Sequence, residues 1–192
     1  MLKRFLIASL AIICSFTFSS QVNAASNQTH TVQKGESLYK VGKQYGISAQ
    51  QLKAMNHLNK SMIYPGQTLK LPVMLNASEK NLLARLVEAE AKGESYAGKV
   101  AVATVVLNRV ESDEFPDSLR GVVYDGTQFS PVLNGTIHQA ASRESKRAVN
   151  EALGYQGYDR ESLFFYNPGK ASSDYLSSRE VTTVIGNHVF MR

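Results

Sequence analysis

The sequence predicts an α+β protein in two parts: a small strand-helix-helix-strand module, and then a mainly helical domain that carries a small β-hairpin. Three observations support this fold class. Short apolar runs alternate with turn residues between positions 30 and 72, helical patterns recur between 79 and 153, and β-branched and aromatic residues dominate 162–166 and 182–190.

The first 24 residues have the features of a secretory signal. Lys3 and Arg4 precede an apolar run over 5–18, and the small-residue pattern Val22-Asn23-Ala24 follows. We expect cleavage after Ala24 and an exported product. The run is shorter than the ~20 residues that a spanning helix needs, so no stable membrane span is expected.

The composition excludes several classes of chemistry. The only cysteine, Cys14, lies in the signal, so cysteine nucleophiles and disulfides are excluded from the processed chain. Loss of Lys3 and Arg4 lowers the formal net charge from +5 to +3. The sequence contains no run of basic residues that would indicate nucleic-acid binding. We expect no metal and no cofactor, and zinc ligation by His138, His188 and a carboxylate stays open as the alternative.

The small module is expected over residues 30–72. A strand at 30–32 leads through a turn to a helix at 38–45, which Gly46 ends. A second helix over 48–56 is followed by a turn and a closing strand within 62–72.

This segment resembles a LysM module, the small fold that binds glycans containing N-acetylglucosamine. The matching positions are 31–38, 46–48, Leu52, Asn56 and 63–69. The resemblance implies a sugar groove between the turn at 35–38 and the loop at 63–66. The candidate contact residues are Gly35, Ser37, Leu38, Ile63, Tyr64, Pro65 and Gly66. Core packing is the competing interpretation for Leu38, and turn formation is the competing one for the glycines.

A short linker is expected at 73–78, and a second domain over 79–192. Residues 73–77 span at most ~18 Å when fully extended, so the two domains would act on neighbouring stretches of one polymer.

The second domain is expected to begin with a helix capped by Ser78 and broken near Gly93. The segment 95–110 is apolar almost all round, which predicts a central, buried helix. Further helices are expected at 118–124 and 142–153.

Irregular chain is expected at 125–131, between two of these helices. Strands are expected at 162–166 and 182–190, with a turn at 167–169.

Glu90 is the most informative residue, because it falls near the centre of the apolar face of the first helix in this domain. That face consists of Leu82, Leu83, Leu86 and Val87. Burial of an acid raises its pKa and suits it to general-acid catalysis. The alternative is an acid paired with Arg85 or Arg109, which would lower its pKa. Glu88 falls on the opposite side and is expected to be solvated.

Residues 81–192 resemble the catalytic domain of the SleB/CwlJ family of cell-wall hydrolases, the spore cortex-lytic enzymes. The matching segments are 83–85, 90–94, 98–110, 128–131, 164–168 and 185–190. The resemblance implies a lysozyme- or transglycosylase-like fold with Glu90 as the catalytic glutamate. One departure is Tyr175, where the family often has tryptophan, and this leaves sugar stacking in doubt.

The family resemblance implies cleavage of the peptidoglycan glycan strand between N-acetylmuramic acid and N-acetylglucosamine by a lytic transglycosylase. In that reaction one acid suffices, because the 6-hydroxyl of the muramoyl sugar attacks the anomeric carbon. The candidate supporting or substrate-binding residues are Glu94, Gln128, Phe129, Tyr166, Asn187 and His188.

Three alternatives stay open. A hydrolytic muramidase or glucosaminidase would need a second carboxylate, nominally Asp125 or Asp174. An amidase would cut the peptide link, and a silent wall-binding protein would cut nothing. The resemblance does not distinguish the vegetative wall from the spore cortex as the location. It also leaves open whether a partner protein regulates the activity.

Overall fold

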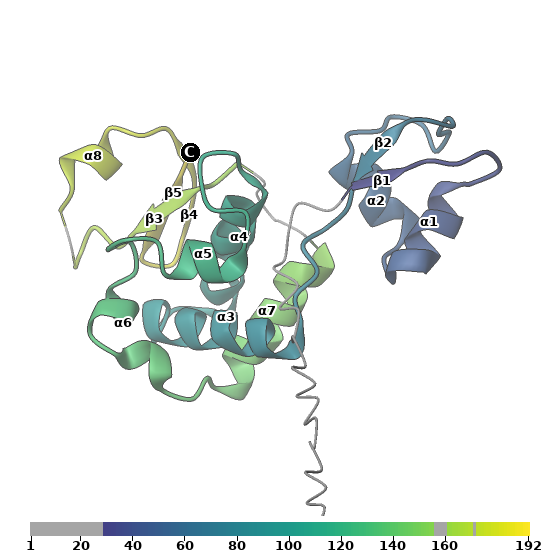
Figure 1. The fold of residues 1–192 in the computed structure, drawn as a ribbon. Coiled ribbons are helices and arrows are strands. Elements are labelled where there is room, and N and C mark those ends of the chain that lie inside the picture. Colours follow the sequence, from purple (N-terminus) through teal and green to yellow (C-terminus); the bar gives the residue numbers. More distant parts are fainter. Residues whose placement is uncertain (1–28, 156–160, 171) are drawn as a thin grey trace, which may run out of the picture.

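The computed structural model describes residues 29–155, 161–170 and 172–192. The expected signal at 1–24 lies outside these residues. Within them, no helix combines the length and apolar character that crossing a bilayer requires. Figure 1 shows the small module at the start of the described residues and the helical domain that follows it. Each has its own hydrophobic core.

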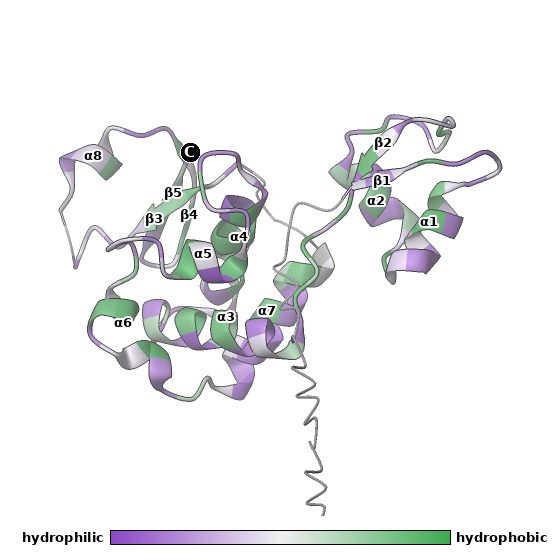
Figure 2. Ribbon diagram, in the orientation of Figure 1, coloured by the Kyte–Doolittle hydropathy of each residue, from purple (hydrophilic) through white to green (hydrophobic). Residues whose placement is uncertain are grey.

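The small module has the expected strand-helix-helix-strand order. Strands β1 (Thr29–Thr31) and β2 (Thr68–Lys70) pair antiparallel, and helices α1 (Leu38–Tyr45) and α2 (Ala49–Met55) lie between them in the chain. Hydrophobic and hydrophilic residues alternate along α1, as Figure 2 shows, because one face packs on the core. The core residues are Val32, Leu38, Val41, Leu52, Leu69 and Leu71.

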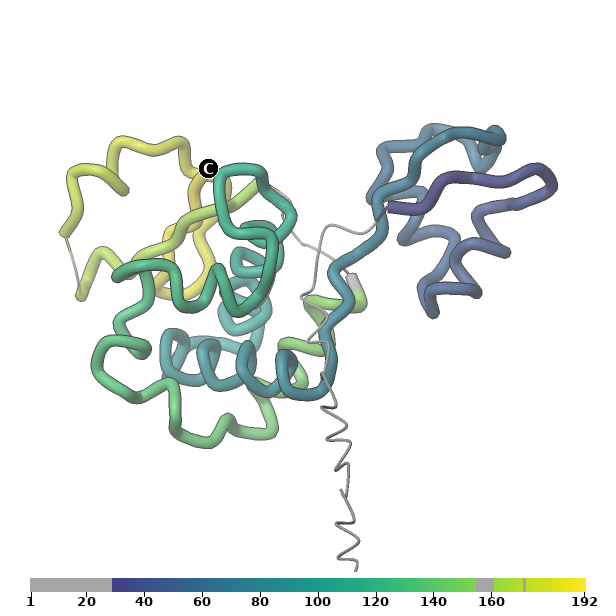
Figure 3. The backbone as a smooth tube through the Cα atoms, viewed as in Figure 1, coloured from purple at the N-terminus to yellow at the C-terminus, as the bar shows by residue number. Residues whose placement is uncertain are grey.

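The chain passes from one core to the other almost without a free linker. Leu71 is buried in the core of the module, whereas Val73 and Leu75 are buried in the core of the helical domain. Pro72 between them is also buried. Val73 and Leu75 of the expected linker therefore pack against the second core, whereas Met74 between them is exposed, and Figure 3 follows this path into the next helix.

Helix α3 (Ala77–Glu90) is capped by Asn76 and not, as expected, by Ser78. Asn76 Oδ1 accepts a hydrogen bond from Glu79 N, and the Glu79 carboxylate accepts one from Asn76 N. This reciprocal pair satisfies two backbone donors at once, which a serine cap two residues later would not do.

Helix α4 (Tyr96–Glu111) lies at the centre of the domain and is buried from Gly98 to Val110, as the sequence predicts. It contacts α3, α5 (Leu119–Val123) and α7 (Arg143–Tyr155).

The segment at 125–131 is less irregular than expected, because Ser130 begins a short helix there. Helix α6 (Ser130–Leu133) is followed by a 3-10 turn, η1 (Thr136–His138).

The sheet has three strands in the order β3-β5-β4, all antiparallel. They are β3 (Phe164–Tyr166), β4 (Val181–Ile185) and β5 (His188–Met191), with the short helix α8 (Asp174–Ser177) before β4. The expectation of one strand over 182–190 is wrong, because the chain turns back at Gly186 and Asn187. Gly186 has a φ of 61°, which suits glycine in a tight turn. The α+β class is confirmed.

Candidate active site

Glu90 is the last residue of α3, and its side chain is partly buried. Burial raises the pKa of Glu90 to about 7, although the positive charges of Arg109 and Lys170 act to lower it. The partial negative charge at a helix C-terminus also disfavours a carboxylate there. Among the described residues, no hydrogen bond or ion pair holds the Glu90 carboxyl group. The expected rise in pKa is confirmed.

Arg109 is fixed beside this site by contacts of its own. Its Nε donates to the Leu163 carbonyl at 2.7 Å, and its Nη1 donates to Gln128 Oε1 at 2.8 Å. Its guanidinium lies over the rings of Phe115, Phe129 and Phe164. Burial lowers the pKa of Arg109 to about 10, so it remains cationic at neutral pH. Arg109 therefore supplies positive charge near Glu90 without pairing with it.

Gln128 and Phe129 both contact Arg109 and help to hold its guanidinium in position. Gln128 accepts from Arg109 and donates from Nε2 to Asp125 Oδ2 at 3.2 Å, so its amide links a cation to a carboxylate. Phe129 is 3% exposed and belongs to the core. The structure thus assigns Phe129 to packing, whereas Gln128 stays exposed at the surface.

Glu94 and Asn187 form a clamp between two distant loops. Asn187 donates from its backbone N to Glu94 Oε2 at 3.1 Å and from Nδ2 to Glu94 Oε1 at 3.0 Å. These hydrogen bonds lower the pKa of Glu94 and keep it ionised. A Cβ on Gly186 would lie 2.6 Å from Glu94 Oε2, so any larger residue there would displace the Glu94 carboxylate from its present position. The clamp joins the loop after Glu90 to the turn between β4 and β5.

His188 begins β5 and is 4% exposed. Its ring meets Phe165 edge-on at 5.4 Å between centroids, and burial lowers its pKa, so the imidazole is neutral at pH 7. His188 Nδ1 has no hydrogen-bond partner within the described part of the chain. Tyr166 lies opposite Val189 in the sheet and is partly buried.

Glu88 is not the solvated residue that the helical wheel suggests. Its Oε2 accepts from Ser142 N at 3.1 Å and from Ser145 Oγ at 2.7 Å, at the start of α7. These hydrogen bonds lower the pKa of Glu88. The expectation is wrong because α7 packs against α3 on this side, and its first turn needs acceptors for its N–H groups.

The structure separates the candidate glycan contacts of the module into exposed and buried groups. Tyr64 is 63% exposed in the loop at 63–66, whereas Leu38 is 3% exposed in the core. Ser37 accepts from Lys40 N and caps α1. Gly35, Gly66 and Pro65 are also exposed, and Ile63 packs against the core.

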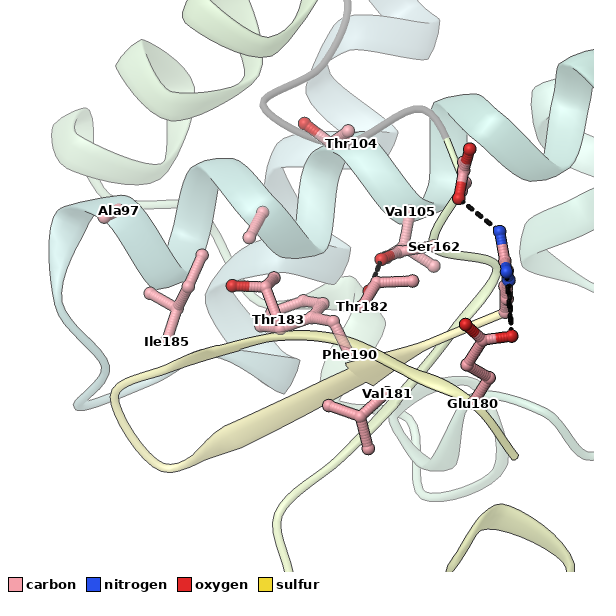
Figure 4. A pocket seen from close by; sticks show the side chains of 13 residues that line it. Ala97, Thr104, Val105, Ser162, Glu180, Val181, Thr182, Thr183, Ile185 and Phe190 are labelled. Atoms are coloured by element: carbon pink, nitrogen blue, oxygen red, sulfur yellow. Dashed lines mark hydrogen bonds and ion pairs between the residues drawn. The ribbon is translucent and has the colours of Figure 1, made fainter. Parts of the chain in front are cut away.

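Described residues line cavities that include the following two, and Glu90 lines neither of these two. One, of about 740 Å³, lies between α4 and the strands β4 and β5 (Figure 4). Its rim carries the ion pairs of Arg192 with Glu161 and Glu180. The other, of about 470 Å³, lies beside α3. No group of three or more His, Cys, Asp or Glu side chains within the described residues could hold a metal ion.

Comparison with protein families finds two matches. The cell wall hydrolase family model matches residues 93–191, and the LysM domain model matches residues 30–72. The first match begins three residues after Glu90.

Individual cell-wall enzymes also resemble parts of this chain. A spore cortex-lytic enzyme of Halalkalibacterium halodurans is 37% identical over 120 residues, which cover 62% of this chain and 36% of that protein. The catalytic domain of the germination-specific lytic transglycosylase SleB from Bacillus anthracis is 34% identical, with a TM-score of 0.57 over 64% of this chain and 100% of that one. An N-acetylmuramoyl-L-alanine amidase, sle1, of Staphylococcus aureus is 40% identical over 142 residues, which cover 71% of this chain and 41% of the amidase. The chain spans less than half the length of these two curated relatives.

Proposed function

This chain belongs to the cell wall hydrolase family, and from that premise we propose that it cleaves the glycan strand of peptidoglycan as a lytic transglycosylase, with Glu90 as the catalytic acid and base. The bond cut would be the one between N-acetylmuramic acid and N-acetylglucosamine. The likeness to the SleB catalytic domain supports the reaction type.

The observation that carries this proposal is the protonation state of Glu90. A carboxylic acid with a pKa of about 7 is substantially protonated at neutral pH and can give its proton to a leaving oxygen. Glu88 and Glu94, the other acids nearby in the sequence, have lowered pKa values and accept fixed hydrogen bonds. They are therefore unsuited to the role of acid.

In the proposed reaction Glu90 donates its proton to the glycosidic oxygen as the bond from that oxygen to the anomeric carbon breaks. The resulting carboxylate then takes the proton of the muramoyl 6-hydroxyl, whose oxygen bonds to the anomeric carbon. The product is a 1,6-anhydro end, and no water is consumed. Arg109 and Lys170 favour the carboxylate form that this second step uses.

The domain organisation follows as part of the proposal. Residues 1–24 direct export, the LysM domain at 30–72 holds the glycan, 73–78 connect the two parts, and 79–192 carry out catalysis. Tyr64 and its neighbours in the exposed loop at 63–66 are the proposed sugar contacts, with the exposed turn at Gly35 and Ser37 opposite. Gln128, Tyr166, Asn187 and His188 are proposed to border the cleaved sugar, and Glu94 is proposed to hold Asn187 there.

Amidase activity is the second candidate, because the S. aureus amidase is also a relative. The two reactions give different products. A transglycosylase releases anhydro-muropeptides, a glycan hydrolase releases products heavier by one water, and an amidase releases free peptides.

Mass spectrometry of a peptidoglycan digest therefore tests the proposal. We expect anhydro-muropeptides with the wild-type protein and none with Glu90→Gln, which keeps the size of the side chain but has no proton to transfer. Glu114→Gln, at an exposed position, is the matched control. Unchanged release by Glu90→Gln would refute the mechanism, and free peptides would indicate the amidase.

A further inference from the structure

The smaller cavity, of about 470 Å³, is a polar groove along one side of α3. It lies between the last turns of this helix and the chain from Ser130 to Ala140. Most of the side chains that line it are charged or polar: Arg85, Glu88, Lys92, Asn134, Thr136 and Gln139. Of these, only Glu88 has a role in the contacts described above.

The charges in this groove favour an anionic occupant. Arg85 and Lys92 are cations, and the one carboxylate, Glu88, already accepts hydrogen bonds from Ser142 and Ser145. Arg85 Nε is buried and has no acceptor among the residues that the structure describes. A guanidinium beside an ammonium is a setting in which carboxylates bind by charge-assisted hydrogen bonds.

The groove is close to the proposed cleavage site but separate from it. Arg85 precedes Glu90 by five residues, so the two side chains lie about 140° apart around the helix. Ser130 and Pro131, at the start of α6, line the groove, and Gln128 just before them contacts Arg109. The start of α6 therefore stands between the groove and the surroundings of Glu90.

We propose that this groove binds a carboxylate of the peptide stem that branches from N-acetylmuramic acid. The inference rests on the proposed function, because it requires the muramoyl sugar to be bound at Glu90. A peptide extends by about 3.3 Å per residue, so a stem of a few residues can pass around the end of α3 from the sugar to Lys92. There Lys92 and Arg85 meet the carboxylate, and the amide of Gln139 offers a further donor.

Peptide-bearing and peptide-free glycan strands test this site. Both substrates are prepared from sacculi freed of phosphate-containing polymers, and one is then stripped of its stems by an amidase. We expect Arg85→Gln and Lys92→Gln each to lower kcat/KM on the peptide-bearing strands by roughly 3- to 10-fold, mainly through KM. Neither variant should change kcat/KM on the stripped strands.

Lys80→Gln is the matched control, because Lys80 is an exposed cation at the other end of the same helix. It should leave both substrates unaffected. Lys92 is exposed, so Lys92→Gln keeps the test valid if Arg85→Gln does not fold. A second measurement is independent of cleavage: an acidic stem peptide titrated into the Glu90→Gln protein should shift the amide signals of Lys92 and Gln139, and the same peptide with amidated carboxyl groups should not.

Equal losses on both substrates, or no loss on either, would overturn the proposed site. A loss seen only with sacculi that retain phosphate-containing polymers would overturn it too, in favour of a phosphate ligand. If the wild-type protein cleaves neither substrate, the proposed function fails instead, and the peptide titration still decides whether the groove binds carboxylates.

Discussion

Burial of Glu90 has two opposing consequences: it raises the pKa, as the proposed acid catalysis requires, and it destabilises the folded protein when Glu90 is ionised. Its pKa in the folded state is about 7, above the ordinary value of 4.5. The folded protein therefore binds this proton more tightly than the unfolded chain does. The cost of ionising Glu90 is absent below pH 4.5, grows as the pH rises, and is complete above pH 7.

Replacing Glu90 with glutamine should therefore stabilise the protein, but only where Glu90 is ionised. We expect Glu90→Gln to raise the free energy of unfolding at pH 8 by roughly 1–3 kcal/mol and to leave it nearly unchanged at pH 4. Urea unfolding at the two pH values measures this. Glu114→Gln should change neither value, and an equal gain at both pH values for Glu90→Gln would show that ionisation is not the cause.

Burial raises the pKa of Glu90, and the cations near it limit that rise, so they should also lower the upper pH limit of the proposed activity. Arg109 lowers the pKa of Glu90 more than Lys170 does, so removal of either charge should move the alkaline limb of the pH profile to higher pH. We expect a larger displacement for Arg109→Gln than for Lys170→Gln, in profiles of kcat/KM. Arg109→Lys keeps the charge and should leave the limb in place, even if the lost contact with Gln128 lowers the rate. A profile that moves to lower pH in either glutamine variant would contradict this assignment.

At the scale of elements, the sheet packs on α4, and the clamp between Glu94 and Asn187 ties the turn between β4 and β5 to the loop between α3 and α4. The clamp depends on Gly186, which has both a positive φ and no room for a Cβ. Gly135 has a similar φ of 79°, but nothing lies within 4 Å of its would-be Cβ. A comparison of alanine substitutions at these two glycines therefore separates the cost of backbone strain from the cost of steric crowding.

We expect Gly135→Ala to lower the free energy of unfolding by about 1 kcal/mol, from strain alone. Gly186→Ala should lower it by about 1–2 kcal/mol more, because its Cβ also displaces the Glu94 carboxylate. Thermal or urea unfolding of both variants gives the difference. Equal costs at the two positions would show that the clamp yields to the added methyl group without loss.

Some features of these elements could be predicted from the sequence, and others could not. Helix periods and caps are local, so α1, α2 and α4 and the inward direction of Glu90 could be predicted from neighbouring residues. The role of Glu88 could not, because its partner Ser142 is 54 positions away. The sequence analysis also did not identify the turn at Gly186, since the β-branched run 181–185 before it and Val189 and Phe190 after it together have the composition of one strand.

At the scale of the whole molecule, the junction between the module and the helical domain determines how the two act together. Leu71 and Val73 belong to different cores, and only Pro72 stands between them. A proline restricts both its own φ and the residue before it, so the junction has little freedom to bend.

We therefore expect the two parts to tumble together in solution. Nuclear magnetic relaxation should give one rotational correlation time for the module and the helical domain of the wild-type protein. A flexible Gly-Ser insertion of about eight residues between Pro72 and Val73 should shorten the correlation time of the module. The same insertion in the exposed loop at 59–61 should leave the common value in place. Two different correlation times in the wild-type protein would contradict a stiff junction.

The sequence by itself determined the α+β class and the two-part order, and it singled out Glu90 as the candidate acid, because each of these depends on periodicity and motifs within a short stretch of chain. The tertiary structure alone decided which distant charges act on Glu90, namely Arg109 and Lys170, and which of the other candidate residues contact one another. Glu94 and Asn187 lie 93 positions apart, and Arg109 reaches Gln128 and Leu163 from another helix. Such contacts form only when distant segments pack, and the same packing removes enough water to raise the pKa of Glu90 to about 7.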